Sequence, residues 1–207
     1  TKLFPAIIPS GTPLGPMQRE IVQETGLTGV QVLATCSHDT GAAVAGVPAF
    51  GQNWAYISSG TWSLMGVELP GPIVTDACRE LNFTNEIGYG GTVRLLKNIV
   101  GLWVVQECRR TWAKAGQDLD YGQLTELAAE SPPFVSLINP TDPRFVNPDE
   151  MPEKISAFCR ETDQPVPETL GAAIRCVLES LALLYRRTLK QIEQLTGIHI
   201  ERVHIVG

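Results

Sequence analysis

The sequence predicts an α/β domain with a mixed sheet flanked by helices. Two strand-like runs, Trp54–Ser58 and Trp62–Leu69, flank the turn Ser59-Gly60-Thr61 and predict a hairpin. Apolar residues recur at a spacing near 3.6 over Glu168–Leu195, which predicts a long helix. A final strand is expected at Val203–Val206. Strands followed by helices and then by another strand are typical of layered α/β packing.

The other elements of the first half follow in chain order. The Pro and Gly residues of Thr1–Gly15 favour extended or turning backbone. Beyond them, the pattern predicts a short helix at Met17–Thr25. We then expect a strand, a short helix and two more strands, at Val30–Thr35, Thr40–Val47, Leu81–Asn85 and Thr92–Leu95.

Helices are expected to dominate the second half. One helical stripe is formed by Ile99, Leu102, Trp103, Gln106 and Arg110. A second helix is predicted at Tyr121–Glu130, followed by a proline-punctuated loop at Pro140–Pro152. The long third helix is expected to stop at Gly197, because glycine suits the position just past a helix end.

Composition and charge exclude several classes of function. With 207 residues, 43% of them hydrophobic, the chain suits one domain with a real core, and no apolar run reaches the length of a membrane span. The net charge of −6, without a cluster of Lys and Arg, argues against a nucleic-acid partner. Five scattered cysteines and three histidines give no metal-ligand spacing. We therefore expect no metal site built from these side chains, and free thiols in a reducing, cytoplasmic setting.

The most informative motif is Ser37-His38-Asp39-Thr40, followed about twenty residues later by Ser58–Ser63. An aspartate can accept the proton of an alcohol, and the small residues Gly60 and Thr61 let the backbone approach a phosphate. Together the two motifs predict phosphoryl transfer to a hydroxyl. Each motif also has a purely structural interpretation, in which Asp39 caps the following helix and Gly60 with Thr61 makes an ordinary hairpin turn.

Two amides and one glycine are further candidates for the site. Gln106 falls on an apolar helical stripe, so its amide is expected to point inward. Eight residues of helix would separate Asn98 from Gln106 by roughly 12 Å, enough for one to reach a sugar and the other a nucleotide. The alternatives are a helix N-cap for Asn98 and a satisfied core amide for Gln106. The last strand ends at Gly207, and such a strand commonly leads into a turn that holds a nucleotide.

The motifs of this chain, taken in order, are similar to those of one family. They include Ser37–Thr40, Tyr56–Ser63, Asn82–Glu86, Leu96–Ile99, Gly101–Trp103, Ile138–Pro140, Phe145–Pro148, Cys176–Leu183 and His204–Gly207. In these segments the chain resembles the rhamnulokinases, which belong to the FGGY carbohydrate kinases. The resemblance extends over nearly the whole chain.

This resemblance implies an actin-like, ribonuclease-H-like fold. It also implies transfer of the γ-phosphoryl group of ATP to the 1-hydroxyl of L-rhamnulose, with Mg²⁺ helping to neutralise the phosphates. Asp39 matches the catalytic base of the family, and His38, Thr40 and Asn98 match its sugar contacts. Some members of the family have a cysteine pair in the corresponding region, which makes Cys159 and Cys176 the pair to check for a disulfide.

The nucleotide contacts implied by the resemblance are Thr61, with Gly60 beside it, and Gln106. Residues 1–207 are expected to be the second, C-terminal domain of a two-domain kinase, truncated at both ends. The first domain would be its partner in the active site, and a glycine-rich turn is expected after Gly207. We therefore expect no turnover from these residues alone, because two substrates must meet across a closing cleft. Two alternatives stay open: an FGGY kinase for fuculose, xylulose or another polyol, and a non-catalytic actin-like module that binds nucleotide or sugar.

Overall fold

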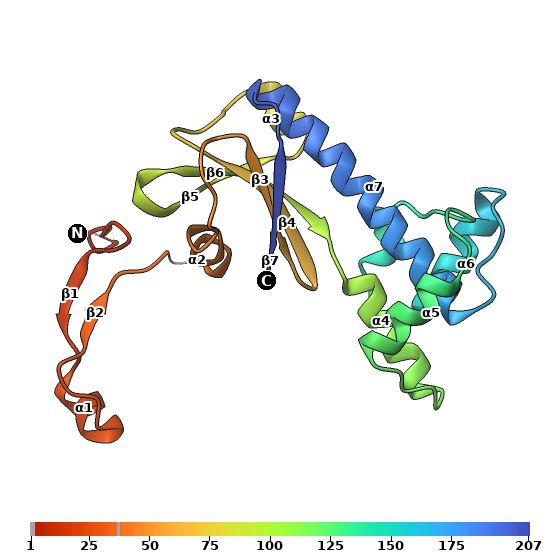
Figure 1. Cartoon of the computed structure of the whole chain (residues 1–207), viewed down its shortest axis with the longest axis horizontal. Helices are drawn as coiled ribbons and strands as arrows, with labels where there is room; N and C mark the ends of the chain where they lie inside the picture. Colours follow the sequence, from red (N-terminus) through yellow and green to blue (C-terminus); the bar gives the residue numbers. More distant parts are fainter. Residues whose placement is uncertain (1–2, 37) are drawn as a thin grey trace.

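A five-stranded mixed sheet organises the main body of the chain (Figure 1). The computed structural model describes residues 3–36 and 38–207, and within them the strand order of this sheet is β5-β6-β4-β3-β7. Its strands are β3 (Trp54–Ser59), β4 (Trp62–Leu69), β5 (Thr84–Ile87), β6 (Val93–Val100) and β7 (Arg202–Val206). The strand β7 pairs in parallel with β3, whereas all other neighbours in the sheet are antiparallel. The predicted mixed sheet and the hairpin of β3 and β4 are confirmed.

One face of the sheet packs on the long helix α7 (Leu170–Thr196). Met65, Val67 and Leu69 of β4 are buried in the same core cluster as Ile192 of the helix. Successive side chains of a strand point to opposite faces, so these alternate residues share one face. The helix begins at the N-cap Thr169 and ends at Gly197, which has a φ of 70°. The predicted long helix and its glycine stop are confirmed to within two residues.

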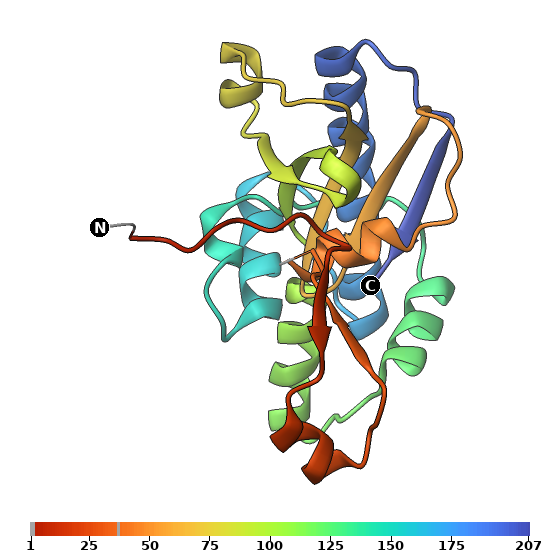
Figure 2. The same cartoon turned by 90° about the vertical axis from the view of Figure 1, so that its left-hand side faces the viewer.

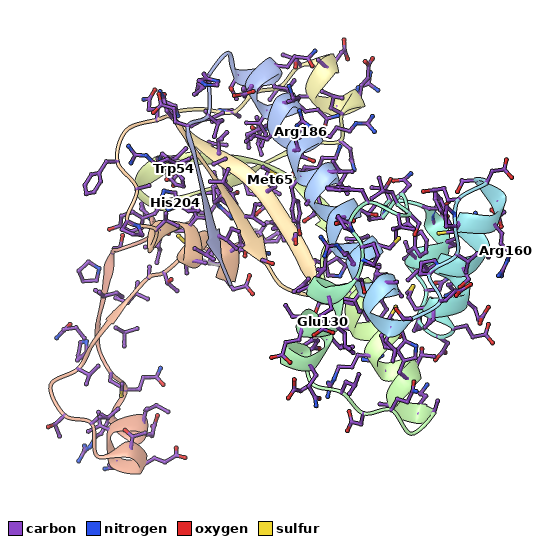
Figure 3. All side chains as sticks on the ribbon, turned by 45° about the vertical axis from the view of Figure 1, so that its right-hand side comes forward. Trp54, Met65, Glu130, Arg160, Arg186 and His204 are labelled. Carbon is purple, nitrogen blue, oxygen red and sulfur yellow. The ribbon has the colours of Figure 1, made fainter. Side chains whose placement is uncertain are left out.

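The opposite face of the sheet carries the short helix α2 (Asp39–Ala45). The buried cluster beneath it contains Val44 of the helix with Tyr56 and Leu96 of the sheet. Trp54 packs at the margin of this cluster, and its ring meets that of His204 edge to face at 5.7 Å (Figure 3). A helix of seven residues covers only part of a five-stranded sheet, so the rest of this face stays open.

Beyond the sheet, four helices enclose a second core. They are α4 (Trp103–Lys114), α5 (Tyr121–Glu130), α6 (Met151–Glu161) and the first half of α7. The helix α5 has the predicted bounds and begins with a capping box between Asp120 and Gln123. All five cysteines of the chain are free thiols, and Cys159 and Cys176 lie in this core.

The helix predicted from the stripe that starts at Ile99 begins later than expected. The strand β6 continues through Asn98 and Ile99 to Val100, and α4 begins only at Trp103. Gly101 separates the two elements, and a Cβ atom at this glycine would lie 2.7 Å from the carbonyl oxygen of Gly60. A close approach of two backbones, which periodicity does not reveal, therefore fixes the change from strand to helix here.

Two helices were not expected from the sequence. The short α3 (Asp76–Glu80) precedes β5, so this strand begins at Thr84 rather than at the predicted Leu81. The helix α6 begins at Met151, inside the predicted proline-punctuated loop, and holds Pro152 in its first turn. Proline is tolerated there because the first backbone N–H groups of a helix have no intrahelical acceptor.

The first part of the chain forms an arm that extends away from the sheet (Figures 1 and 2). It consists of β1 (Pro13–Pro16), α1 (Arg19–Thr25) and β2 (Gln31–Leu33), with β1 and β2 antiparallel. None of residues 3–36 is buried. Side chains stand singly on this arm, whereas they crowd between the sheet and α7 (Figure 3). Over the described ranges, we find no helix with the length and apolar character that crossing a membrane requires.

Candidate active site

A cleft of about 670 Å³ lies on the sheet face that carries α2. Its floor comes from residues of four strands that point to this face, namely Ser58, Trp62, Leu64, Glu86 and Asn98. Leu64 is the register partner of both Ser58 and Asn98, so these three side chains form one row across the sheet. The remaining lining comes from the turn after β3, from Gly207, and from the segment that starts α2.

Asp39 is the first helical residue of α2 and lines this cleft. Its side chain is 95% exposed, so the carboxylate is open to the cleft and to solvent. The N-cap position belongs to His38, whose Nδ1 accepts a hydrogen bond from the backbone N–H of Thr40 at 3.2 Å. Oδ1 of Asp39 accepts from the same N–H at 2.7 Å. The capping interpretation therefore applies to His38 first, and one carboxylate oxygen of Asp39 makes no hydrogen bond with the described residues.

His38, Asp39 and Thr40 all reach the cleft, as the motif predicts. Ser37, the first residue of that motif, lies outside the described residues. The first turns of α2 pack closely at Gly41, where an added Cβ would lie 3.0 Å from the Cβ of Cys36 and 3.3 Å from Nη2 of Arg94 on β6. A larger residue at this position would require these two side chains to shift slightly.

The turn between β3 and β4 is fixed to the start of α4. The carbonyl oxygens of Gly60 and Thr61 accept hydrogen bonds from the backbone N–H groups of Leu102 and Trp103, at 2.9 and 3.0 Å. These N–H groups belong to the first turn of a helix, where no intrahelical acceptor exists. Gly60 lines the cleft beside Ser59. The hairpin interpretation of this turn is correct for its local structure, and contact with a phosphate stays a prediction.

Thr61 and Gln106 lie together, outside the lining of the cleft. The Thr61 hydroxyl donates a hydrogen bond to Oε1 of Gln106 at 3.1 Å. Gln106 also borders a separate hollow of about 250 Å³ beside α4 and α5. The two side chains predicted to contact nucleotide are thus joined to each other, whereas Asp39 and Asn98 line the larger cleft.

Asn98 is exposed on β6 and lines the cleft, but not for the reason given by helical spacing. It lies in a strand, so neither the helix N-cap interpretation nor the helical distance to Gln106 applies. Side-chain alternation along β6 is what directs Asn98 to the cleft face. Gly207 also lines the cleft, with a φ of 137° and its Cα close to the backbone of Ser59. A side chain at Gly207 would collide with the Ser59 carbonyl oxygen.

Sequence reasoning missed several residues of the cleft. Glu86 entered only as part of a motif, and Trp62 was given no role, although both line the cleft. Arg94, buried beneath it, was not considered. Glu86 on β5 could have been identified from its cross-strand pairing with Arg94, the residue opposite it on β6. Such a pairing connects two strands and cannot be read from either one alone.

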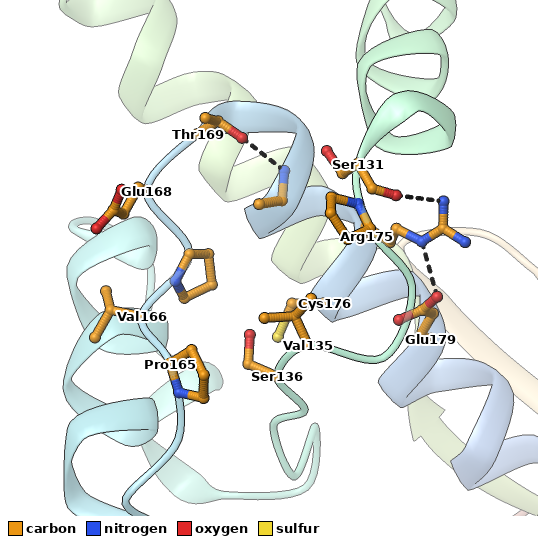
Figure 4. Close-up of a pocket in the computed structure, with 13 residues that line it drawn as sticks. Ser131, Val135, Ser136, Pro165, Val166, Glu168, Thr169, Arg175, Cys176 and Glu179 are labelled. Atoms are coloured by element: carbon orange, nitrogen blue, oxygen red, sulfur yellow. Dashed lines mark hydrogen bonds and ion pairs between the residues drawn. The ribbon is translucent and has the colours of Figure 1, made fainter.

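A second cavity, of about 330 Å³, lies between α5 and the start of α7 (Figure 4). Two of its charged side chains, Arg175 and Glu179, are paired with each other. Arg175 donates to the carbonyl oxygens of Ala128, Ala129 and Ser131, and its Nε donates to Glu179 at 2.9 Å. These bonds satisfy the last carbonyls of α5, so Arg175 serves the helix end and is not available to a ligand.

The chain is similar to known carbohydrate kinases in sequence. It matches the FGGY family of carbohydrate kinases, C-terminal domain, over residues 55–207. It is 48% identical over 197 residues to the rhamnulokinase of Bacteroides thetaiotaomicron, covering 95% of this chain and 40% of that protein. The rhamnulokinase of Enterococcus faecalis is 42% identical over 207 residues, covering 99% and 41% respectively. The chain thus spans about 40% of the length of these curated relatives.

Solved structures share the fold at much lower identity. The xylulose kinase of Rhodospirillum rubrum superposes with a TM-score of 0.63 at 17% identity, over 96% of this chain and 39% of that one. The ligand-bound xylulose kinase of Lactobacillus acidophilus gives 0.62 at 14% identity, over 97% and 40%. These likenesses confirm the predicted actin-like α/β fold. Because the family match extends over most of the chain, the chain belongs to the FGGY family of carbohydrate kinases and corresponds to their C-terminal domain.

Proposed function

We propose that this chain is the C-terminal domain of a rhamnulokinase, which transfers the γ-phosphoryl group of ATP to the 1-hydroxyl of L-rhamnulose. The exposed carboxylate of Asp39, opening onto a cleft shared with Asn98 and the turn at Gly60, is the observation that carries this proposal. The identity of 48% to a protein named rhamnulokinase supports the choice of sugar. The products are ADP and L-rhamnulose 1-phosphate.

In this reaction Asp39 acts as the general base. As the sugar oxygen bonds to phosphorus and the bond from phosphorus to the ADP oxygen breaks, the hydroxyl proton passes to the Asp39 carboxylate. Exposure of the carboxylate lets the proton leave to solvent after each turnover.

The lining of the cleft separates sugar contacts from nucleotide contacts. His38, Thr40 and Asn98 offer polar groups that suit the hydroxyls of a ketose. Gly60 and Gly207 present backbone without a side chain, which suits close approach of a phosphate. The bonded pair of Thr61 and Gln106 would contact the nucleotide beyond the cleft.

The ligands of Mg²⁺ and the other wall of the site are assigned to groups other than the side chains of the cleft. Among the described residues, no group of three or more His, Cys, Asp and Glu is placed to hold a metal ion. Mg²⁺ in such kinases binds largely through the phosphates of the nucleotide and neutralises their charge. The chain spans about 40% of its relatives, so we assign the other wall of the site to an N-terminal domain of the same protein. We place the enzyme in the cytoplasm, where ATP is available.

A coupled assay of ADP release tests this function on the full-length protein. L-Rhamnulose, L-fuculose and D-xylulose are compared at equal concentrations, with phosphorylation at O1 verified on the product. We expect kcat/KM to be highest for L-rhamnulose. A preference for another ketose would replace the substrate and keep the kinase, whereas binding of sugar and ATP without turnover would support the non-catalytic module.

A companion measurement tests the expected need for two domains. Residues 1–207 are purified alone and assayed beside the full-length protein with L-rhamnulose and ATP. We expect no turnover from the shorter chain, because proximity of two substrates across a closing cleft supplies much of catalysis. Turnover that depends on Asp39 in the shorter chain would contradict this expectation.

A further inference from the structure

The cleft contains a second carboxylate, Glu86, at the end opposite the row of Ser58, Leu64 and Asn98. Asp39 and Glu86 are the two acidic side chains among the described residues that line it. The Glu86 side chain is 32% exposed, and its Oε2 accepts a hydrogen bond from Nη2 of Arg94 at 2.9 Å. Its Oε1 makes no hydrogen bond with any described residue.

Arg94 is an unusual partner because it is buried. Only 1% of its side chain is exposed, and its Nε and Nη1 atoms have no hydrogen-bond partner in the described part of the chain. A charge taken out of water in this way is costly unless an opposite charge is held close to it. Glu86 supplies that charge, since it makes the one ion pair that Arg94 forms with the described residues.

The surroundings of Arg94 connect it to the catalytic helix. Nη2 would lie 3.3 Å from a Cβ atom placed on Gly41, in the first turns of α2. The buried phenol of Tyr56 is also near Arg94: burial raises the pKa of Tyr56, and the Arg94 guanidinium opposes that rise. Arg94 therefore lies between the helix that carries Asp39 and the carboxylate of Glu86.

Stability alone does not account for this pair. Buried ion pairs can often be replaced by apolar residues of similar volume without loss of stability. A carboxylate anchored on one oxygen and open to a cavity on the other is instead a fixed acceptor for a donor group. Sugar hydroxyls are such donors, and a hydrogen bond to a charged acceptor is stronger than one to a neutral acceptor.

Glu86 and Asn98 line different parts of the cleft. Asn98 and Arg94 are four residues apart on β6, which places the Glu86 row roughly 13 Å from the Asn98 row along the strands. A ligand that contacts both rows must span much of this distance. Glu86 and Asn98 can therefore contact different hydroxyls of one ligand.

We propose that Glu86 is a sugar-positioning residue, which accepts a hydrogen bond from a ketose hydroxyl other than the one phosphorylated, and that Arg94 holds it in place. This inference rests on the proposed kinase function and adds to it a determinant of sugar specificity. It assigns no proton transfer to Glu86.

The test compares Glu86→Gln with the wild-type full-length protein. The substitution keeps the shape of the side chain and removes its charge. We expect KM for the ketose to rise roughly 10- to 100-fold while KM for ATP stays unchanged. The matched control is Glu68→Gln, because Glu68 is the register partner of Arg94 on β4 but does not line the cleft. Its KM values are expected to remain at the wild-type level.

Deoxy analogues of the ketose, each lacking one hydroxyl, give a readout that a structural role would not change. For one analogue we expect the wild-type enzyme to lose most of its kcat/KM, and Glu86→Gln to treat analogue and parent ketose alike. Should Glu86→Gln fold poorly, Glu86→Asp keeps the charge and withdraws the carboxylate, and the same loss of discrimination is expected. An unchanged ketose KM in an active enzyme, or an equal loss on every analogue, would overturn the inference alone. Absence of turnover by the wild type on every ketose would overturn the proposed function and the inference with it.

Discussion

The two faces of the sheet differ in what they contain. The face against α7 is closed by the second half of this 27-residue helix, over an apolar cluster that includes Met65, Val67 and Ile192. The face against α2 has a small buried cluster, an open cleft and the buried polar side chains of Tyr56 and Arg94. We infer that the α7 face supplies most of the stability of this sheet and that the α2 face supplies the chemistry.

The largest effect is expected from Asp39→Asn on the α2 face. An amide cannot accept the proton, so kcat should fall about 10²- to 10⁴-fold, with little change in the free energy of unfolding. A coupled assay and thermal unfolding measure the two quantities. Asp76→Asn is the matched control, since Asp76 is also an exposed first residue of a helix, α3. Activity retained in Asp39→Asn would remove the base assignment.

The next effect concerns the α7 face. Ile192 is fully buried against the sheet, and Ile192→Ala should lower the free energy of unfolding by about 2–5 kcal/mol through lost burial and the cavity left behind. Denaturant unfolding of the variant measures this change. Ile205→Ala is the control, because Ile205 on β7 is 71% exposed, and it should change stability little. Equal losses for both variants would contradict the contrast between the faces.

A smaller effect is expected from a polar contact between α7 and the strand β4. The Tyr185 hydroxyl of α7 lies 2.6 Å from Oγ of Ser63, which is fully buried beside the Gly60 turn. Tyr185→Phe leaves that buried hydroxyl without its partner and should cost about 1–3 kcal/mol of stability. A double-mutant cycle with Ser63→Ala measures the coupling directly. Additive losses in that cycle would mean that the pair does not connect the helix to the turn.

The smallest expected effect is a pH dependence of the fold's stability, which arises at the C-terminal end of α7. The backbone N–H of Ile200 donates to the Glu193 carboxylate at 2.9 Å, and this bond, with His199 nearby, lowers the pKa of Glu193 below its ordinary value. A carboxyl with a lowered pKa stabilises the fold above its unfolded pKa, and this contribution is lost as the pH falls through the folded pKa. Stability should therefore fall below about pH 4.5.

Glu193→Gln tests this dependence through thermal unfolding at pH 6 and pH 3.5. The variant should show a smaller drop in Tm between the two pH values than the wild type. Glu130→Gln, at the exposed end of α5, is expected to keep the wild-type drop. An identical drop in the Glu193 variant would show that its carboxylate does not contribute.

The sequence predicted those helices whose ends and faces are set by residues within or next to the helix itself. The bounds of α5 follow from its capping box and the prolines beyond it, and α7 follows from its apolar spacing and Gly197. The position of Asn98 was predicted wrongly, because an apolar run can be continued as strand or as helix until a tertiary contact decides. Here the contact of Gly101 with the turn at Gly60 ends the strand.

In the candidate site, too, features set by neighbouring residues were predicted and features set by tertiary contacts were not. Asp39, with its neighbours, was identified from a contiguous motif, and the structure places that motif at a cleft. The pairing of Glu86 with Arg94, and that of Thr61 with Gln106, depend on strand register and on how the hairpin meets α4. Such pairings are set by the whole fold, so periodicity and spacing along the chain do not contain them.

The parallel pairing of β7 with β3 also bears on how the protein is made. Asn53 and Glu201 lie side by side in space although 148 residues separate them in the chain. A ribosome must therefore release almost all of this domain before the last strand can dock and Gly207 can complete the cleft. Contacts between distant residues slow folding, so the cleft should form late, after the apolar packing of α7.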